Sequence, residues 1–275
     1  MSDITTAVLT GAGGGLGRAL ALRLARPGVR LLLADIHQPR GAETAELCRA
    51  RGAEAHVATT DVSDAAQVEQ LGIEADRVLG RIDLVVNNAG VAATGAIGEA
   101  PLANWQWIMS INLWGVIHGC HVFTPRLIKQ GGGAVLNVAS AAGIACAPTM
   151  APYNVTKAGV IALSETLAAE VAQHHIGVTV LCPVFFKTNL LETARVASDA
   201  ERAMAESAFA NSTMTADQVA AAALRAVARG DLYCLPMREA RLMWRVKRLM
   251  PLRFHKTMAS ARLQRMARER ARRGA

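Results

Sequence analysis

The chain has 275 residues, of which 52% are hydrophobic and 19% are charged, with a formal net charge of +8. A chain of this length and apolar content buries one large core, which excludes disordered and collagen-like proteins. No apolar run approaches the roughly 20 residues that a membrane-spanning helix needs. The N-terminal sequence MSDITTAVLT has no basic segment and does not resemble a signal peptide. These features predict a globular cytoplasmic protein.

The five cysteines are scattered along the chain, and none forms a CxxC or a metal-finger pattern. They are Cys48, Cys120, Cys146, Cys182 and Cys234. Unpaired spacing of this kind predicts free, mostly packed thiols in a reducing compartment and no metal site.

Short runs rich in Val, Leu and Ile alternate with segments of helical period along the chain. Strands are predicted at residues 5–10, 29–35, 54–60, 82–88, 133–140, 178–183 and 232–235. Helices are predicted near residues 15–26, 39–51, 64–80, 103–130, 152–174 and 216–229. Strands that are buried on both faces read as continuous apolar runs, and right-handed crossovers arrange them in parallel. The alternation predicts an α/β protein with a Rossmann-type, doubly wound parallel sheet of about seven strands, flanked by helices.

The first predicted strand leads into a glycine-rich loop, TGAGGGLG, at residues 10–17, and an amphipathic helix follows. Glycines permit a tight turn and let backbone amides approach a pyrophosphate at the positive end of the helix. A plain strand-to-helix turn is the alternative, but the position between strand and helix favours nucleotide binding. The residues assigned to this phosphate site are Gly11, Gly14, Gly15, Leu16 and Gly17.

The second predicted strand ends in Asp35, about 20 residues after the glycine loop. A carboxylate at this position accepts hydrogen bonds from the ribose hydroxyls and repels a 2′-phosphate, although a solvated acid at a strand end is the alternative. Arg18 and Arg40 are candidates for binding a 2′-phosphate, but neither removes the repulsion from Asp35. The sequence therefore predicts NAD as cofactor, with NADP less favoured, and Ile36 is placed in the same site.

A candidate catalytic set follows in the second half of the chain. Tyr153 and Lys157 are four residues apart, so they share one face of a helix. A tyrosine that moves protons near neutral pH needs a pKa well below its ordinary value of about 10, and a neighbouring ammonium lowers it by favouring the phenolate. Ser140 closes the fifth strand and can hold a substrate oxygen, and Asn112 lies in the sequence SINLWG.

Together with the sequence NNAG at residues 87–90, these motifs resemble the short-chain dehydrogenase/reductase family over about residues 4–237. The resemblance implies that Tyr153 is the general acid/base and that Ser140 orients the carbonyl or hydroxyl group. Lys157 lowers the pKa of the tyrosine and binds the nicotinamide ribose, and Asn112 holds a water molecule in a proton relay. The family also contacts adenine and lines its cofactor through residues that match Asp61, Val62, Asn88, Ala89 and Gly90. For Asn88, an amide that stabilises the sheet is an equally good interpretation.

One motif departs from the family, which usually has Pro-Gly after the sixth strand. This chain reads Pro183-Val184-Phe185-Phe186-Lys187-Thr188, so a side chain replaces glycine near the nicotinamide. We expect Val184 to narrow the pocket and change the local loop. By the resemblance, Pro183, Val184, Phe186 and Thr188 belong to the cofactor site.

The stretches that line substrate pockets in the family are apolar in this chain and carry no charge to bind a phosphate or carboxylate. They read VAATGAIG at 91–98, AAGIACAPTM at 141–150 and VFF at 184–186. An apolar pocket with few polar groups fits an uncharged hydrophobic ligand. The residues assigned to this pocket are Ser140, Met150, Tyr153 and Phe185, although Met150, Phe185 and Phe186 are also candidates for the core. Residues 189–214 are predicted to form a lid over the site.

These features predict an NAD-dependent oxidoreductase that interconverts a steroid-like, lipid-like or aryl-like secondary alcohol and its ketone. Two alternatives remain at this point: a non-catalytic protein that senses a dinucleotide and binds a partner, and an NADP-dependent ketone reductase of the same family. The resemblance also implies a homodimer or homotetramer that packs through the helices near 103–130 and 152–174.

The positive charge lies at the C-terminal end of the chain. Residues 238–275 contain 13 Lys and Arg against two acids, whereas residues 1–237 contain 17 against 20. We therefore divide the chain into a catalytic domain at 1–237 and a basic amphipathic helical tail at 238–275. The tail's apolar residues Leu242, Met243, Val246, Leu249 and Met250 share one helix face. Packing on a subunit and peripheral attachment to an anionic membrane both fit this pattern, whereas nucleic acid binding is not expected.

Overall fold

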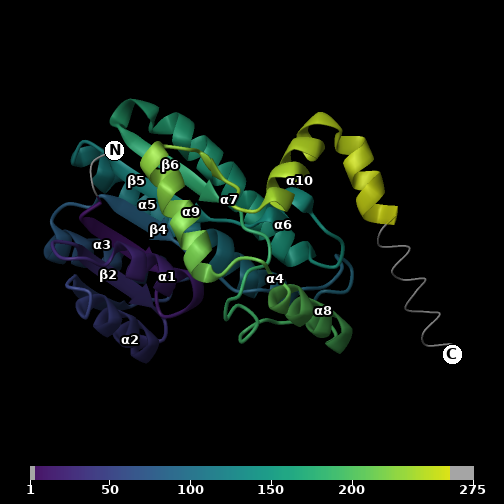
Figure 1. Ribbon diagram of the computed structural model, residues 1–275, viewed down its shortest axis with the longest axis horizontal. Helices are drawn as coiled ribbons and strands as arrows, with labels where there is room; N and C mark the ends of the chain where they lie inside the picture. Colours follow the sequence, from purple (N-terminus) through teal and green to yellow (C-terminus); the bar gives the residue numbers. More distant parts are fainter. Residues whose placement is uncertain (1–3, 261–275) are drawn as a thin grey trace.

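The computed structural model describes residues 4–260 as a parallel sheet covered by helices on both faces (Figure 1). The strands are β1 (Thr6–Thr10), β2 (Arg30–Asp35), β3 (Glu54–Thr59), β4 (Leu84–Asn87), β5 (Gly133–Val138), β6 (Ile176–Leu181) and β7 (Tyr233–Cys234). The longer helices are α1 (Gly15–Leu24), α2 (Gln38–Arg49), α3 (Ala65–Leu79), α5 (Gly115–Lys129), α7 (Ala151–Glu170) and α9 (Ala216–Arg229). The predicted Rossmann-type sheet with seven strands is confirmed.

The strand order is β3-β2-β1-β4-β5-β6-β7, and every neighbouring pair is parallel. The chain builds outward from β1 to β3, then returns to the other side of β1 and continues with β4. The connections from β1 and β4 therefore leave in opposite directions, which opens a crevice outside the carboxyl ends of these two strands. This crevice holds the candidate active site.

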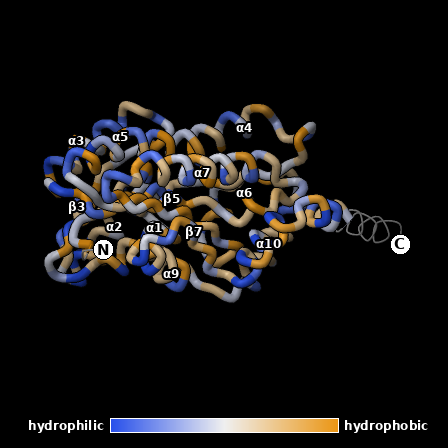
Figure 2. Tube along the Cα trace, turned by 90° about the horizontal axis from the view of Figure 1, so that it is seen from above, coloured by the Kyte–Doolittle hydropathy of each residue, from blue (hydrophilic) through white to orange (hydrophobic). Residues whose placement is uncertain are grey.

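Two apolar layers separate the sheet from its helices. Leu20 of α1, Ala45 of α2 and Val227 of α9 pack with one face of the sheet. Val68 of α3 and Phe123 of α5 pack with the opposite face, together with residues of α7. Figure 2 shows the arrangement, with α3, α5 and α7 along one side of the sheet and α9 along the other. Burial on both faces explains why the strands are continuous apolar runs in the sequence.

The helix predicted at 103–130 contains a local change of winding. It consists of α4 (Leu102–Met109), a π-helical turn at Ser110–Trp114 and α5, with no break between them. A π-turn inserts an extra residue, and such turns occur frequently at functional sites. Asn112 lies within this turn and is completely buried. Hydrophobic periodicity did not reveal the π-turn, because one inserted residue hardly disturbs a pattern of this length.

The predicted lid segment contains a well-formed helix, α8 (Asp199–Ala210). Ser198 caps it by accepting a hydrogen bond from the Glu201 amide, and Asp199 and Glu201 lie in its first turn. A side-chain cap and acids in the first turn both stabilise a helix N-terminus. The Ala-rich, weakly periodic sequence is therefore helical at this position because its ends are well capped.

The C-terminal tail begins with α10 (Arg238–Leu249), which contacts the short helix α6 (Ala141–Ala145), and residues 251–260 are again helical. The tail residues 261–275, including the apolar positions Leu263 and Met266, lie outside the described residues. Between residues 4 and 260, no helix combines the length and apolar character required to cross a bilayer.

Candidate active site

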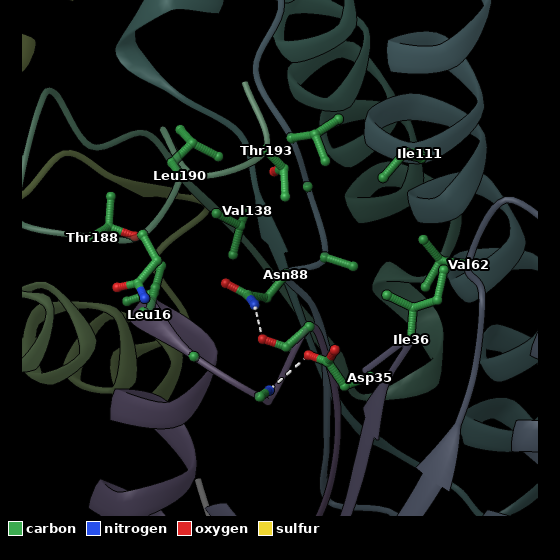
Figure 3. Close-up of a pocket in the computed structure, with 18 of the residues that line it drawn as sticks. Leu16, Asp35, Ile36, Val62, Asn88, Ile111, Val138, Thr188, Leu190 and Thr193 are labelled. Carbon is green, nitrogen blue, oxygen red and sulfur yellow. Dashed lines mark hydrogen bonds between the residues drawn. The ribbon is translucent and has the colours of Figure 1, made fainter. Parts of the chain in front are cut away.

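A cleft of about 270 Å³ lies at the carboxyl ends of β1 and β4. Its walls come from the glycine loop, the ends of β2 and β4, the start of α7 and the segment that follows β6. Figure 3 shows Ile36, Val62 and Ile111 along one wall and Leu16, Thr188 and Leu190 along the opposite wall. The topology thus brings together motifs that are far apart in the sequence.

The glycine loop leaves backbone amides of α1 without a side-chain partner. Gly14 occupies the N-cap of α1, and no side chain caps this helix. A Cβ added to Gly14 would meet no atom within 4 Å, so the space in front of the helix terminus is open. Gly11 and Gly15 have φ angles of +63° and +50°, a region that glycine adopts without strain. The residues here fit the phosphates of a dinucleotide, because unpaired amides and the helix dipole attract anions.

Gly17 has a different role from its neighbours. It is buried in α1 and is not part of the cleft wall. A Cβ at this position would lie 2.1 Å from the Gly11 carbonyl oxygen and 2.7 Å from Asn88 Nδ2. Its assignment to the cofactor site therefore needs correction: Gly17 permits the close packing of α1 against the loop that carries the binding amides.

Asp35 is held in place by two backbone amides at the end of β2. Its Oδ2 accepts a hydrogen bond of 2.7 Å from the Gly13 amide, and its Oδ1 accepts one of 2.8 Å from the His37 amide. Figure 3 shows the bond from Gly13, which connects the carboxylate to the glycine loop. The carboxylate is thereby fixed on the cleft wall, and each of its oxygens retains a lone pair for a ribose hydroxyl.

The two arginines near Asp35 are both paired. Arg18 forms a two-point ion pair with Glu43, and its Nη2 also donates to the Gly13 carbonyl at 2.9 Å. Arg18 therefore braces the glycine loop against α2. Arg40 lines the cleft and pairs with Glu192 of the predicted lid at 3.1 Å.

The adenine end of the cleft is apolar. Ile36, Val62 and Ile111 all line it, and Ile36 is 55% exposed although it is a large hydrophobic residue. Asp61 also lines this end, and its Oδ1 accepts hydrogen bonds from the amide and hydroxyl of Ser63. The three apolar side chains form one wall on which a flat aromatic base can pack.

Asn88 connects the two strands that flank the crevice. Its Nδ2 donates to the carbonyl oxygens of Thr10 at 2.9 Å and Gly11 at 3.0 Å, and its amide donates to Thr10 Oγ1. Ala89 and Gly90 continue the cleft wall beyond it. Asn88 thus lines the cleft and also ties the end of β4 to the glycine loop, so both sequence interpretations describe the same side chain.

Ser140 is positioned by α6. It occupies the N-cap of this helix, where its Oγ accepts a hydrogen bond of 3.1 Å from the Ala142 amide and contacts the Pro183 carbonyl at 3.4 Å. Gly143 in the same helix packs directly on the backbone of Lys157, because an added Cβ would lie 2.5 Å from the Lys157 carbonyl carbon. These contacts fix the serine relative to the helix that carries Tyr153 and Lys157.

Tyr153 and Lys157 lie on one face of α7, as their spacing predicts, and both line the cleft. The Lys157 Nζ lies 5.7 Å from the centre of the Tyr153 ring and donates a hydrogen bond of 2.8 Å to the Val138 carbonyl. Burial lowers the pKa of Lys157 to about 8. Burial also raises the pKa of Tyr153 to about 12, and a hydrogen bond with Ser140 opposes this rise. The lowering of the tyrosine pKa that the sequence predicted from Lys157 is not seen in this structure, because burial raises the pKa and only the hydrogen bond with Ser140 opposes it.

Asn112 does not extend its side chain into the cleft. Its Oδ1 accepts a hydrogen bond of 2.8 Å from the Val91 amide, and its Nδ2 donates one of 2.8 Å to the Val91 carbonyl. The Asn112 amide therefore fastens the π-turn to the chain after β4. The side chain thus positions this part of the chain, while the water that the resemblance places at Asn112 stays a prediction.

The segment after β6 divides between the cleft and the core. Pro183, Phe186 and Thr188 line the cleft, and the Thr188 hydroxyl lies over Gly15, where an added Cβ would be 2.7 Å away. Val184 packs instead against the apolar core and is absent from the cleft wall. The predicted side chain near the nicotinamide is therefore not seen, and Val184 does not have the positive φ that glycine favours.

The two predicted substrate residues outside the catalytic set lie beside the cleft rather than on its wall. Phe185 is 37% exposed, and its ring meets that of Phe209 in α8 edge to face at 5.2 Å. Met150 is half-buried and pairs through the backbone with Gly95. Phe185 thus connects the segment after β6 to α8, and Met150 lies just before α7, the helix that carries Tyr153.

The lid is attached to the catalytic domain at several points. Arg195 stacks on the Trp107 ring at 4.0 Å and donates to Asn104, and the Arg195 amide donates to the Ala92 carbonyl at 3.0 Å. The Thr94 hydroxyl donates to Glu201 of α8 at 2.5 Å. These contacts fix the segment that includes Arg195 and Glu201 against residues 92–107.

Sequence reasoning missed several residues of the cleft wall. They include Gly13, His37, Thr60, Ile111, Val138, Asn189, Leu190 and Thr193. Most of them follow directly on a motif that was recognised, as His37 follows Asp35, so proximity to a motif was the available signal. No sequence signal marked Ile111 as a cleft residue, because the π-turn determines where its side chain lies.

Comparison with known proteins agrees with this geometry. A family model described as short chain dehydrogenase matches residues 5–199. The "Probable oxidoreductase EphD" of Mycobacterium tuberculosis is 32% identical over 262 residues, covering 92% of this chain and 44% of that protein. The chain thus spans less than half the length of this relative.

Two solved structures are also similar to this chain. A short-chain dehydrogenase/reductase from Burkholderia phymatum in complex with NAD is 33% identical, with a TM-score of 0.84 over 90% of this chain and 93% of that chain. A short-chain dehydrogenase from Sphingobium yanoikuyae in complex with NADPH is 25% identical, with a TM-score of 0.76 over 96% and 95%. The chain belongs to the short-chain dehydrogenase family of oxidoreductases.

Proposed function

We propose that the protein transfers a hydride between a nicotinamide dinucleotide and a hydrophobic secondary alcohol or its ketone, with NAD preferred over NADP. The observation that carries the proposal is the meeting of Ser140, Tyr153 and Lys157 beside a cleft whose far end holds Asp35. A protein that only sensed a dinucleotide would not need a tyrosine, a lysine and a serine positioned to move a proton.

The protein's part in the reaction is proton transfer and positioning. The bound nicotinamide supplies the hydride acceptor or donor. In the direction of oxidation, Tyr153 Oη takes the proton of the substrate hydroxyl, and Ser140 Oγ donates a hydrogen bond to the same oxygen. Lys157, whose ammonium lies beside the tyrosine ring, stabilises the phenolate that must form. Its pKa of about 8 leaves it mostly protonated at neutral pH.

The preference for NAD rests on Asp35. Two amides hold the carboxylate at the position of the ribose, where it binds hydroxyls and repels a 2′-phosphate. Arg40 lines the cleft near Asp35 and could attract a 2′-phosphate, but it is paired with Glu192. Of the two solved relatives, one binds NAD and the other NADPH, and the more similar by sequence binds NAD.

The hydrophobic substrate class follows from the charges around the lid. Arg195 contacts Asn104 and the Trp107 ring, and Glu201 accepts a hydrogen bond from Thr94, so both charged groups near the lid already have partners within the protein. Met150, Phe185 and Phe209 add apolar side chains near this region. An apolar secondary alcohol or ketone fits this lining.

Absorbance of NADH provides the test. We expect purified protein to reduce NAD with a panel of apolar secondary alcohols, faster than with NADP, and to be nearly inactive with small hydroxy acids. Faster turnover with NADP would indicate that Arg40 dominates over Asp35. Tight binding of NADH without turnover of any alcohol or ketone would favour the sensing function.

A further inference from the structure

The C-terminal helix α10 has one face fixed to the catalytic domain. Ala240 is completely buried, and Lys247, seven residues later on the same side, donates a hydrogen bond of 2.7 Å to the Ile144 carbonyl of α6. The Trp244 ring between them meets the Tyr233 ring edge to face at 5.4 Å. These contacts determine which side of the helix points away from the protein.

The opposite face carries exposed leucines. Leu242 and Leu249 are seven residues apart, so they lie two turns apart on one side of α10, and they are 63% and 79% exposed. Leu252 follows just after the helix and is 78% exposed. The stripe predicted from the sequence included Leu242 and Leu249, but the structure packs the helix through the side of Ala240 and Lys247. The leucines therefore have no partner among the described residues.

Basic side chains alternate with these leucines. Arg238, Arg241 and Arg245 lie on the same side of α10 and are exposed. Within residues 4–260, none of the three forms an ion pair or a side-chain hydrogen bond. Residues 238–260 contain seven Lys and Arg and one acid, and the chain continues to residue 275 with six further arginines. Figures 1 and 2 show the C-terminal helices projecting from one end of the molecule, so this face is accessible.

We propose that this face, which we call the Leu/Arg face and define as Arg238, Arg241, Leu242, Arg245 and Leu249, attaches the protein to the surface of an anionic membrane. Leucine side chains enter the boundary between headgroups and acyl chains, while the long arginine side chains reach the phosphates. Basic residues next to such a surface are attracted by its negative potential. The helix lies in the plane of the membrane.

The charge pattern favours a membrane over a second copy of the chain. In a symmetric contact this face would meet its own copy, so the three arginines of one copy would lie against the same three arginines of the other. Residues 1–237 carry 17 bases against 20 acids, so a second copy offers little negative charge to complement the tail. An anionic bilayer suits both kinds of side chain on this face: its acyl layer receives the leucines, and its negatively charged headgroups pair with the arginines.

Sedimentation of the full-length protein with lipid vesicles tests this proposal. We expect binding to phosphatidylcholine vesicles that contain about 30% phosphatidylserine, little binding to pure phosphatidylcholine, and weaker binding at high salt. The variant Leu242→Gln/Leu249→Gln should lower the partition coefficient at least about tenfold. The variant Arg241→Gln/Arg245→Gln should lower it and weaken its dependence on phosphatidylserine.

Matched controls separate this face from general effects. Leu102 is 78% exposed at the start of α4, so Leu102→Gln removes an equally exposed leucine elsewhere and should bind vesicles like the unmodified protein. Lys129→Gln/Arg225→Gln removes the same amount of charge from exposed positions on α5 and α9 and should change binding much less than the tail variant. Thermal unfolding checks that each variant is folded.

Three outcomes would overturn the proposal. The first is equal sedimentation with both kinds of vesicle. The second is unchanged binding of the leucine variant. The third is a fall in the molar mass of the leucine variant in light scattering without loss of vesicle binding, which would assign the face to contact between copies. The readout is binding alone, so it is independent of whether the protein turns over an alcohol.

Discussion

The two ends of this molecule are stabilised in different ways. At the nucleotide end, backbone groups make the decisive contacts: the Gly13 and His37 amides hold Asp35, and α1 presents uncapped amides to the cleft. At the substrate end, side chains make them: Arg195 on Trp107, Phe185 on Phe209, and Lys247 on α6. Backbone geometry tolerates few residue types, whereas side-chain contacts can be replaced, so we expect the nucleotide end to be similar and the substrate end to vary among related enzymes.

The catalytic residues lie between the two ends, and their removal should have the largest effect. We predict that Tyr153→Phe lowers kcat by about a thousandfold or more, because no other group in the cleft replaces the phenol in proton transfer. Tyr233, the second of the two tyrosines in the chain, contacts Glu165 and Arg248 away from the cleft. Tyr233→Phe is therefore the matched control, and an equal loss in both variants would contradict the assignment.

At the nucleotide end, Asp35 is expected to determine the choice of cofactor. We predict that Asp35→Asn raises the ratio of kcat/KM for NADP to that for NAD by about 10- to 100-fold, because it removes a charge that repels the 2′-phosphate. Adding Arg40→Gln should reverse part of the gain, because Arg40 lines the cleft and can exchange its partner Glu192 for the 2′-phosphate. An unchanged ratio in Asp35→Asn would show that Asp35 does not face the ribose.

Lys157 is expected to reduce stability while it supports catalysis. Burial lowers its pKa from 10.5 to about 8, so the unfolded chain binds this proton more tightly than the folded protein. This difference destabilises the folded protein fully below pH 8, where Lys157 is protonated in both states. The destabilisation disappears as the pH rises towards 10.5, because the unfolded chain then loses the proton too. At 1.36 kcal/mol per pKa unit it amounts to about 3 kcal/mol, and loss of the hydrogen bond to Val138 offsets about 1 kcal/mol in a variant.

We therefore predict that Lys157→Met is nearly inactive, yet its free energy of unfolding at pH 7 exceeds that of the unmodified protein by about 2 kcal/mol. The difference should shrink between pH 8 and 10.5, as measured by denaturant unfolding at a series of pH values. A variant less stable at pH 7 would show that the lysine is paired favourably in the folded state.

At the substrate end, the smallest expected effect concerns the contact between the tail and the catalytic domain. Lys247 donates to the Ile144 carbonyl at the end of α6, and Ser140 caps the beginning of the same helix. We predict that Lys247→Met lowers kcat a few-fold and the free energy of unfolding by about 1 kcal/mol. Arg245→Met, on the exposed side of α10, is the control. Equal kcat values would show that α6 is held by Gly143 and Ser140 alone.

The elements near the nucleotide end were largely predictable from the sequence. Asp35 was placed correctly at the end of β2 because a short apolar run ends there, and Tyr153 and Lys157 share a helix face because of their spacing alone. Gly17 was grouped with its loop because a glycine required for packing and a glycine required for a ligand look the same in a sequence. Only the distance from its Cβ position to the Gly11 carbonyl separates the two roles.

The orientation of α10 could not be predicted in the same way. An amphipathic pattern indicates which side of a helix is apolar, but α10 packs through Ala240, Trp244 and the stem of Lys247. The shape of the surface formed by α6 and Tyr233 selects these residues, because a small side chain and a flat ring fit where leucines do not. Local patterns, which depend on neighbours in the chain, determined the sheet, the glycine loop and the catalytic helix. Contacts between distant segments decided the π-turn, the attachment of Arg195 to Trp107 and the exposed leucines, because their energy depends on surfaces that exist only after the chain has folded.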